Sequence, residues 1–199
     1  MNRVTRLVQI VSLAIVLVAC GSSPPVRYYD LEALETGYSP DKAGAINIGV
    51  GPLRTPDYLS RPRMVTRAAD AMIVVNDFDR WVEPLDDAIH RVLATNLDAQ
   101  LDDAVVVAFP YTHISDLDYR VVGRIDRFDA DADGLAVLEI QWRVIGLNDE
   151  ILVQPRRARY EARSSREPKY AGIARAMSEV VQQLSRDVAA RLEALVVKP

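Results

Sequence analysis

The only cysteine of the chain, Cys20, has a setting that predicts covalent lipid attachment. Two arginines near the start precede a mostly apolar run over 7–18, and the small residue Ala19 comes directly before the cysteine. A basic start, a short apolar run and a small residue at the cleavage point are the regions of a secretory signal peptide. A cysteine in the next position is typical of a bacterial lipobox, in which the thiol takes a diacylglyceryl group. We therefore predict a leader over 1–19 and a mature chain that starts at Cys20.

The residues after Cys20 predict how the anchor is connected. The new amino terminus is expected to carry a fatty acyl chain such as palmitate, and the small, proline-rich segment 20–27 is expected to act as a tether. The apolar run is shorter than the roughly 20 residues that span a bilayer, which disfavours a spanning helix. Gly21, rather than aspartate, follows the cysteine, and by resemblance to known lipoproteins this favours the outer membrane. An ordinary signal peptide or an uncleaved short anchor is the alternative.

A second candidate for chemistry is the run Asp-x-Asp-x-Asp-Gly over 129–134, which matches the first half of an EF-hand calcium loop. That loop must end with a bidentate glutamate at its twelfth position. The twelfth position here is Ile140, and Glu139 lies one place early. Neighbours along a strand point to opposite faces, so Glu139 cannot take that place. We therefore predict an acidic hairpin turn rather than a metal site, with Asp-Gly as the turn signal.

The histidines, His90 and His113, do not form a recognisable catalytic or metal-binding pattern. Neither is spaced for zinc, and no Gly-x-Ser-x-Gly nucleophile motif occurs. A hydrolase could draw only on Glu83, Asp86 and His90. We expect both histidines to be structural or exposed, and the chain to be neither an enzyme nor a cofactor-binding protein.

The charge balance excludes nucleic acid as a partner. The chain has 24 Lys and Arg against 28 Asp and Glu, and it becomes more negative when the leader is removed; phosphate binding needs a basic face. One basic cluster stands out: Arg156, Arg157, Arg159, Arg163, Arg166 and Lys169. It is either a docking surface for an acidic partner or anionic lipid, or the solvated face of an edge strand. We favour the edge strand.

The elements that position these residues can be predicted from periodicity. Apolar residues at helical spacing predict helices from Pro84 to about Leu101 and over 170–196. Alternating or continuous apolar runs predict strands over 26–34, 46–50, 63–67, 71–75, 104–109, 119–125, 136–144 and 151–163. The 104–109 run is expected to be a central strand buried on both faces. We predict one α+β domain over 28–199: a mostly antiparallel sheet in which six or seven of these segments form strands, with two main helices packed on one face.

Several short motifs resemble a known family. They are Gly51-Pro52-Leu53, Pro56-x-Tyr58-Leu59-x-Arg61-Pro62, Asp79-Arg80-Trp81-x-Glu83-Pro84-Leu85, Leu93-x-x-Asn96-Leu97 and Asp118-Tyr119-Arg120-Val121. With the lipobox, they make the chain similar to the PqiC/YmbA type of lipoprotein, the auxiliary lipoprotein component of ABC-type transport. The similarity covers about 28–192. The acidic loop after Phe128 departs from the family pattern.

The resemblance implies a function that the residues alone do not. Members of this family are partners of MCE systems, in which an ABC permease and MCE-domain proteins move lipids or other hydrophobic molecules between two membranes. The lipoprotein would dock the periplasmic conduit to the outer membrane. Cys20 carries over as the anchor, while Tyr58, Leu59, Arg61 and Trp81 are candidates for a partner or homo-oligomer surface. The alternative is a periplasmic lipoprotein that binds and regulates a cell-wall or polysaccharide-export enzyme.

Overall fold

The computed structural model describes residues 24–34, 42, 46–69, 72–111, 116–165 and 169–196. The predicted leader, Cys20 and His113 lie outside the described residues, so the structure does not bear on them. Within the described ranges, neither helix is long and apolar enough to cross a membrane.

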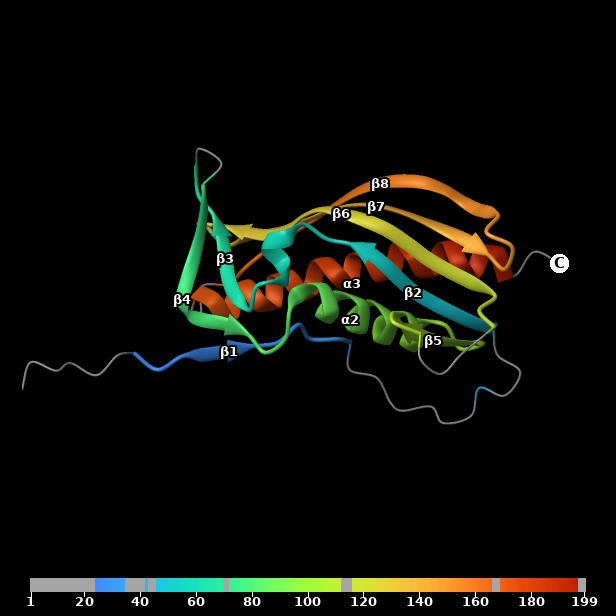
Figure 1. The fold of residues 1–199 in the computed structure, drawn as a ribbon, viewed down its shortest axis with the longest axis horizontal. Coiled ribbons are helices and arrows are strands. Elements are labelled where there is room, and N and C mark those ends of the chain that lie inside the picture. Colours follow the sequence, from blue (N-terminus) through green and yellow to red (C-terminus); the bar gives the residue numbers. More distant parts are fainter. Residues whose placement is uncertain are drawn as a thin grey trace, which may run out of the picture.

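One mixed sheet and two helices build the described part of the chain, and both helices lie on the same face of the sheet (Figure 1). The strands are β1 (Arg27–Tyr29), β2 (Ile46–Arg54), β3 (Arg63–Arg67), β4 (Ile73–Trp81), β5 (Ala104–Ala108), β6 (Tyr119–Asp131), β7 (Leu135–Gly146) and β8 (Ile151–Arg163). The helices are α2 (Leu85–Gln100) and α3 (Lys169–Val196), and a short 3-10 helix, η1, spans Asp57–Ser60. The predicted α+β class is confirmed.

The long strand β6 lies at the centre of the sheet. One of its edges pairs with antiparallel β7 along almost its whole length, and β8 pairs with β7. Its other edge pairs first with β2 and then with β3, which both run parallel to it. β5 extends the sheet beyond β2, while β4 and β1 extend it beyond β3. The sheet therefore splits into two arms on one side of β6.

The prediction of a mostly antiparallel sheet with six or seven strands is wrong, because the sheet is mixed and has eight strands. Four pairs are parallel: β1 with β4, β2 with β5, β2 with β6 and β3 with β6. In each of these pairs, other elements separate the two strands in the sequence. Such crossover connections bring the second strand back in the same direction as the first. The alternation of apolar residues, from which the strands were predicted, carries no information on strand direction.

The expectation that 104–109 forms a central strand is also wrong. β5 pairs only with β2 and ends one arm of the sheet, and Val105 to Ala108 are only half-buried. The helix α2 packs against this strand. In this chain, the continuous apolar run therefore belongs to a strand at the edge of the sheet with α2 against one face. It does not belong to a strand with a neighbour on each side.

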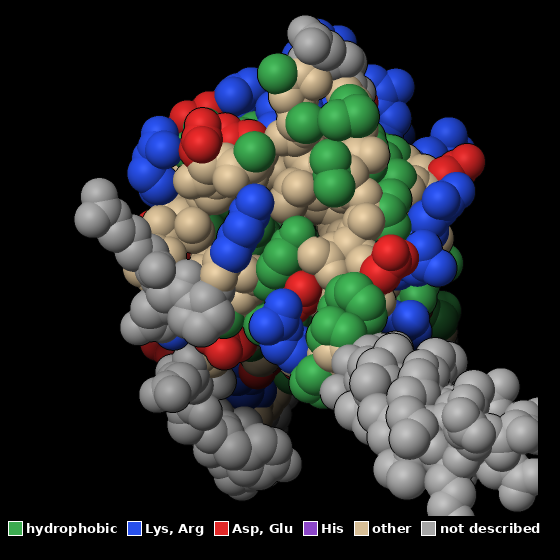
Figure 2. Space-filling model, turned by 90° about the vertical axis from the view of Figure 1, so that its left-hand side faces the viewer, with side chains coloured by type: hydrophobic (Ala, Val, Ile, Leu, Met, Phe, Trp, Pro, Cys, Tyr) green, Lys and Arg blue, Asp and Glu red, His purple; other side chains and the backbone are tan. Residues whose placement is uncertain are grey.

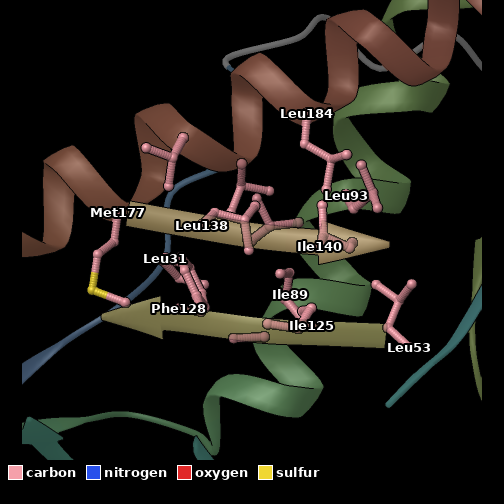
Figure 3. Close-up of a cluster of buried hydrophobic side chains, with 14 of the residues drawn as sticks. Leu31, Leu53, Ile89, Leu93, Ile125, Phe128, Leu138, Ile140, Met177 and Leu184 are labelled. Atoms are coloured by element: carbon pink, nitrogen blue, oxygen red, sulfur yellow. The ribbon is translucent and has the colours of Figure 1, made fainter. Parts of the chain in front are cut away.

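The helices form as their patterns predict. Pro84 directly precedes α2, where a missing N–H costs nothing, and Asp86 and Asp87 lie in the first turn, where the helix dipole favours negative charge. The apolar stripes of both helices meet the inner face of β6 and β7. Figure 3 shows this core, with Ile125 and Phe128 from β6, Leu138 and Ile140 from β7, Ile89 and Leu93 from α2, and Met177 and Leu184 from α3.

The predicted first strand is shorter than its pattern suggests, because only three of its residues pair with a neighbour. Residues 30–34, which we call the strap, follow β1 and are bound to both helices. The backbone N–H of Glu32 donates to Ser178 Oγ of α3 at 3.0 Å, and that of Leu34 donates to Asn96 Oδ1 of α2 at 2.7 Å. Directly before these two bonds, Leu31 is buried in the core. The strap thus joins the N-terminal segment to the helical layer.

Candidate functional surfaces

Tyr58, one of the residues taken as a candidate partner surface, closes a gap in the sheet. Between β2 and β3, part of the edge of β6 has no strand beside it. The Tyr58 hydroxyl lies there, accepting the N–H of Phe128 at 3.1 Å and donating to Asp129 Oδ2 at 3.0 Å. Burial raises the pKa of Tyr58 to about 12, so the hydroxyl keeps its proton at neutral pH. Tyr58 therefore holds the two arms of the sheet together at β6.

Asp129 is fully buried and accepts charged hydrogen bonds from two arginines. Arg67 Nη2 of β3 and Arg127 Nε of β6 each lie 2.7 Å from its carboxylate oxygens. The carboxylate is therefore occupied by structural partners rather than free for a metal. Asp131 closes the following turn by accepting the N–H groups of Asp133 and Leu135, each at 2.9 Å. The predicted acidic hairpin is confirmed.

Replacing Tyr58 with phenylalanine should lower the free energy of unfolding by about 1–3 kcal/mol, since it leaves a strand N–H without its partner and removes one bond from a buried carboxylate. Urea unfolding of the full chain measures the change. Tyr28→Phe is the matched control, because the Tyr28 side chain is exposed, and its effect should stay within about 0.5 kcal/mol. Equal unfolding midpoints for the two variants would show that Tyr58 does not support the sheet.

The other three surface candidates have different positions. Leu59 and Trp81 are buried in the core, so neither side chain lies on the surface of this chain. Leu59 is the buried residue of η1, which packs on α2, and Trp81 ends β4 on its inner face. Arg61 is exposed. The local sequence could not separate these cases, because the burial of each side chain depends on which distant elements pack against it. A partner role stays a prediction for Arg61.

His90 is structural, as predicted, because both of its ring nitrogens bind backbone groups. The N–H of Leu53 donates to Nε2 at 2.9 Å, so Nδ1 carries the proton and donates to the carbonyl of Asp86 at 2.5 Å. Gly51 lies against the same ring with a φ of 113°, and an added Cβ would come within 2.7 Å of His90 Cδ2. His90 thus attaches α2 to β2 at the point where the pairing of β2 with β6 shifts register, between Val50 and Leu53.

The remaining members of the hydrolase set are also engaged elsewhere. Glu83 binds Arg91 at 2.5 Å, and Asp86 Oδ2 accepts from Ser60 at 3.1 Å. Across the ranges that the structure describes, no group of three or more His, Cys, Asp or Glu side chains is placed to hold a metal.

Burial lowers the pKa of His90 below its ordinary value of 6.5. Below that pH the unfolded chain therefore binds more protons than the folded one, so stability falls as the pH drops from about 6.5 towards the folded-state pKa. We expect a slope of at most about 1.4 kcal/mol per pH unit in this window. Urea unfolding from pH 7.5 to 5 measures it, and His90→Gln should remove this component of the slope. An unchanged slope in the variant would assign the effect to other groups.

Asp79 is a second buried carboxylate that the sequence reasoning did not single out. Arg27 binds it through two nitrogens at 2.8 and 2.9 Å, and the Tyr29 hydroxyl donates to it at 3.0 Å. Both partners come from β1, the strand that directly follows the predicted tether. The Asp79–Arg27 pair therefore attaches the N-terminal strand to β4. The sequence gives only a weak indication that Asp79 is buried, since an aspartate in a strand normally faces water.

The face of the sheet away from the helices contains a hollow of about 510 Å³. Arg120, Arg124 and Arg143 line it from β6 and β7, where they alternate with core residues and so point away from the helices. Arg54 joins them from β2. The other lining residues are Pro52, Val122, Gly123, Gln141, Trp142, Ile145 and Pro155. The hollow thus combines four arginines with a largely apolar base and has no acidic residue in its lining.

Only part of this positive charge is neutralised. Arg120 pairs with Asp149, and Arg124 pairs with Asp126 at 2.9 Å, both outside the lining. Arg54 and Arg143 form no ion pair with any described residue. Arg54 also lies directly beside Arg124 in the ladder between β2 and β6, and like charges in such positions repel. An anionic group placed in the hollow would relieve this repulsion.

The basic cluster that the sequence places after residue 155 lies mostly on β8, which pairs only with β7. The arginines of this cluster that lie on β8 are exposed, and Arg159 forms ion pairs with Glu139 and Glu161. The predicted edge strand is confirmed, while Arg166 lies outside the described residues.

Relatives with this sequence and fold are known. The intermembrane transport lipoprotein PqiC of Escherichia coli K12 is 27% identical over 131 residues, which cover 65% of this chain and 68% of that protein, and PqiC of Shigella flexneri matches to the same extent. A crystal structure of an uncharacterized protein has a TM-score of 0.70 at 21% identity, covering 85% of this chain and 99% of that one. A Xanthomonas campestris protein has a TM-score of 0.64 at 15% identity, covering 82% and 93%. These two structures show the fold alone.

A family model gives the assignment. The model for the ABC-type transport auxiliary lipoprotein component matches residues 29–189, almost the whole described domain. That family is defined by a transport-associated role and not by an enzymatic one, and the predicted PqiC-type resemblance is confirmed. The chain therefore belongs to the ABC-type transport auxiliary lipoprotein family.

Proposed function

We propose that this chain is an accessory lipoprotein of an ABC/MCE-type intermembrane transport system, anchored in the outer membrane through Cys20. The match of residues 29–189 to a transport lipoprotein family carries the proposal, and the lipobox of the sequence supports the anchor. The mechanism is positional. Each buried methylene of the acyl chains contributes about 0.8 kcal/mol, so several chains together hold the protein stably at the bilayer. The folded domain then presents a docking surface to the periplasmic conduit.

The arginine hollow is the best candidate for that docking surface. The helices cover the opposite face of the sheet, whereas this face carries two arginines, Arg54 and Arg143, that no acidic residue of the described chain neutralises. Guanidinium groups bind carboxylates in a bidentate manner. We therefore assign the hollow to an acidic segment of the MCE-domain protein or of its permease partner. A symmetric homo-oligomer of the lipoprotein would suit a ring-shaped conduit.

Co-purification from membranes tests the proposal. The lipidated chain should retain an MCE-domain protein and an ABC permease. The Cys20→Ala variant should be lost from the outer-membrane fraction, and transport should be abolished. Retention of a cell-wall or polysaccharide synthase instead would favour the alternative, a regulatory lipoprotein. Transport that continues without the anchor would contradict the positional mechanism.

Charge reversal tests the docking surface separately. The double variant Arg54→Glu, Arg143→Glu should lose the MCE partner but stay folded and membrane-bound, because both side chains reach solvent and neither forms an ion pair in the described chain. The matched control reverses two exposed charges on α3, Arg186→Glu and Arg191→Glu, and should retain the partner. Equal retention by both double variants would assign docking to another face.

A further inference from the structure

Apolar side chains occupy the solvent side of β4, against the usual pattern of a half-buried strand. Only the end of the strand alternates, with Asp79 and Trp81 buried on the inner side, because the ladder with β3 shifts register between Arg63 and Val65. The outer side of such a strand normally carries polar residues. Here Val74 and Phe78 are exposed, as is Val75 beside Val74, and Met72 before the strand and Val82 after it are 58% and 56% exposed. Large apolar residues are therefore exposed along the whole length of this strand.

β1 continues this apolar surface. Tyr28 pairs with Arg80 in the parallel ladder, so Tyr28 lies on the side of Phe78 and Val82 and not on the side of Asp79. Tyr28 is 60% exposed, and Val26, two residues earlier, is also exposed. We call this set the β1–β4 stripe: Val26, Tyr28, Met72, Val74, Phe78 and Val82. Figure 2 shows apolar side chains gathered along this end of the molecule, with arginine and lysine side chains on both sides of them.

The stripe is carried on a projecting part of the fold. The β3–β4 hairpin stands out from the rest of the sheet at one end of the domain, and β1 lies along its base (Figure 1). The exposed arginines nearest in the sequence are Arg27, Arg61 and Arg63, and the side chains of Arg27 and Arg63 are 59% and 50% exposed. An apolar strip bordered by cationic side chains is the composition expected of a surface that rests on anionic lipid.

The position of the predicted anchor selects the occupant of this face. Val26 lies six positions after Cys20, and a fully extended chain covers about 3.3–3.6 Å per residue. The stripe therefore begins no more than about 22 Å from the lipid-bearing residue. A soluble partner has no comparable constraint that would hold it beside β1.

We propose that the β1–β4 stripe contacts the headgroup region of the membrane that holds the anchor, so that the hairpin end of the domain faces the bilayer. This proposal rests on the anchoring of Cys20 in the proposed function. It leaves the arginine hollow, which lies on β2, β6 and β7, available for a protein partner. Lipid anchor and stripe then act together as two contacts, which fix the orientation of the domain as well as its location.

A single-cysteine experiment tests the contact. An acylated Cys20 has no free thiol, so Val74→Cys in the full lipidated chain supplies one labelling site on the stripe. The control is Leu147→Cys, which is 63% exposed in the turn between β7 and β8, at the other end of the molecule. Each variant is labelled with an environment-sensitive fluorophore and reconstituted in vesicles of phosphatidylethanolamine and phosphatidylglycerol. We expect a blue shift and strong quenching by nitroxide-bearing lipid at position 74, and neither at position 147.

The possible failures are distinguishable. Equal quenching at both positions, or none at position 74, would overturn the stripe proposal. A blue shift at position 74 that needs no vesicles and disappears on dilution would assign the stripe to self-association and also overturn it. Failure of the anchor shows separately, because the unsubstituted chain would then take up the thiol label on Cys20.

A second variant shows whether the apolar side chains themselves make the contact. In this variant the label is moved to Val82→Cys, because position 74 is now changed. The changes Val74→Glu and Phe78→Glu should reduce quenching several-fold, while the anchored fraction stays the same. Because both side chains are exposed, the fold should tolerate the change, which circular dichroism can verify. Unchanged quenching would contradict the proposal.

Discussion

Substituting Asp129 with asparagine should lower the free energy of unfolding by about 3–5 kcal/mol. The carboxylate is fully buried and is the shared acceptor of Arg67, Arg127 and Tyr58. An amide of the same size carries no charge, and its nitrogen cannot accept the hydrogen bonds that the carboxylate oxygen accepts. The two guanidinium groups would then lie in a mostly buried site without a counter-charge, at the junction where β3 joins β6.

Equilibrium unfolding in urea measures this effect on the full chain. The matched control is Asp126→Asn on the same strand, where the carboxylate is partly exposed and pairs only with Arg124. Exposed pairs of this kind contribute less than about 1 kcal/mol. If the two variants unfold at the same urea concentration, the buried carboxylate does not hold the two arms of the sheet together.

Truncating Leu31 to alanine should cost about 2–5 kcal/mol, the range found for buried leucines that leave a cavity. Leu31 is the buried residue of the strap and lies beside the side chains of β6 and the helices in Figure 3. Its loss should also weaken the strap bonds to Ser178 and Asn96, because nothing else in the strap is buried to the same degree.

Two measurements separate the local effect from the global one. Urea unfolding gives the total change, and hydrogen exchange at the N–H groups of Glu32 and Leu34 reports opening of the strap. Val26→Ala, at an exposed position just before β1, should change stability by no more than about 0.5 kcal/mol. Exchange at Glu32 and Leu34 that is as slow in Leu31→Ala as in the unsubstituted chain would refute the role of Leu31 in holding the strap.

The helices and most strands follow from the sequence because each has a strong local signal. The apolar stripe after Pro84 gives α2, and the Asp-Gly turn gives the β6–β7 hairpin. The direction and order of strands could not be obtained in this way. They depend on which distant segments meet, as when β2 and β3 share one edge of β6.

The candidate surfaces were harder to predict for a related reason. Asp79 and Asp129 are charged residues in strands, and their burial depends on arginines from other strands. The arginine hollow requires Arg54 of β2 to lie beside Arg124 of β6, which only the register reveals. Leu59 and Trp81 could not be assigned to core or surface from their neighbours in the sequence. The predicted lipobox, in contrast, is a contiguous motif, so it can be recognised without knowledge of the fold.

The strap and β1 also determine how tension from the membrane would enter the domain. β1 runs parallel to β4, so a pull on the proposed anchor along the strand loads the backbone ladder in shear. Bonds loaded in shear resist together, whereas bonds at the end of a hairpin unzip one after another. The Arg27–Asp79 pair and the strap behind it share the same load path. The attachment is therefore suited to withstand mechanical force that the proposed anchor would transmit to the domain.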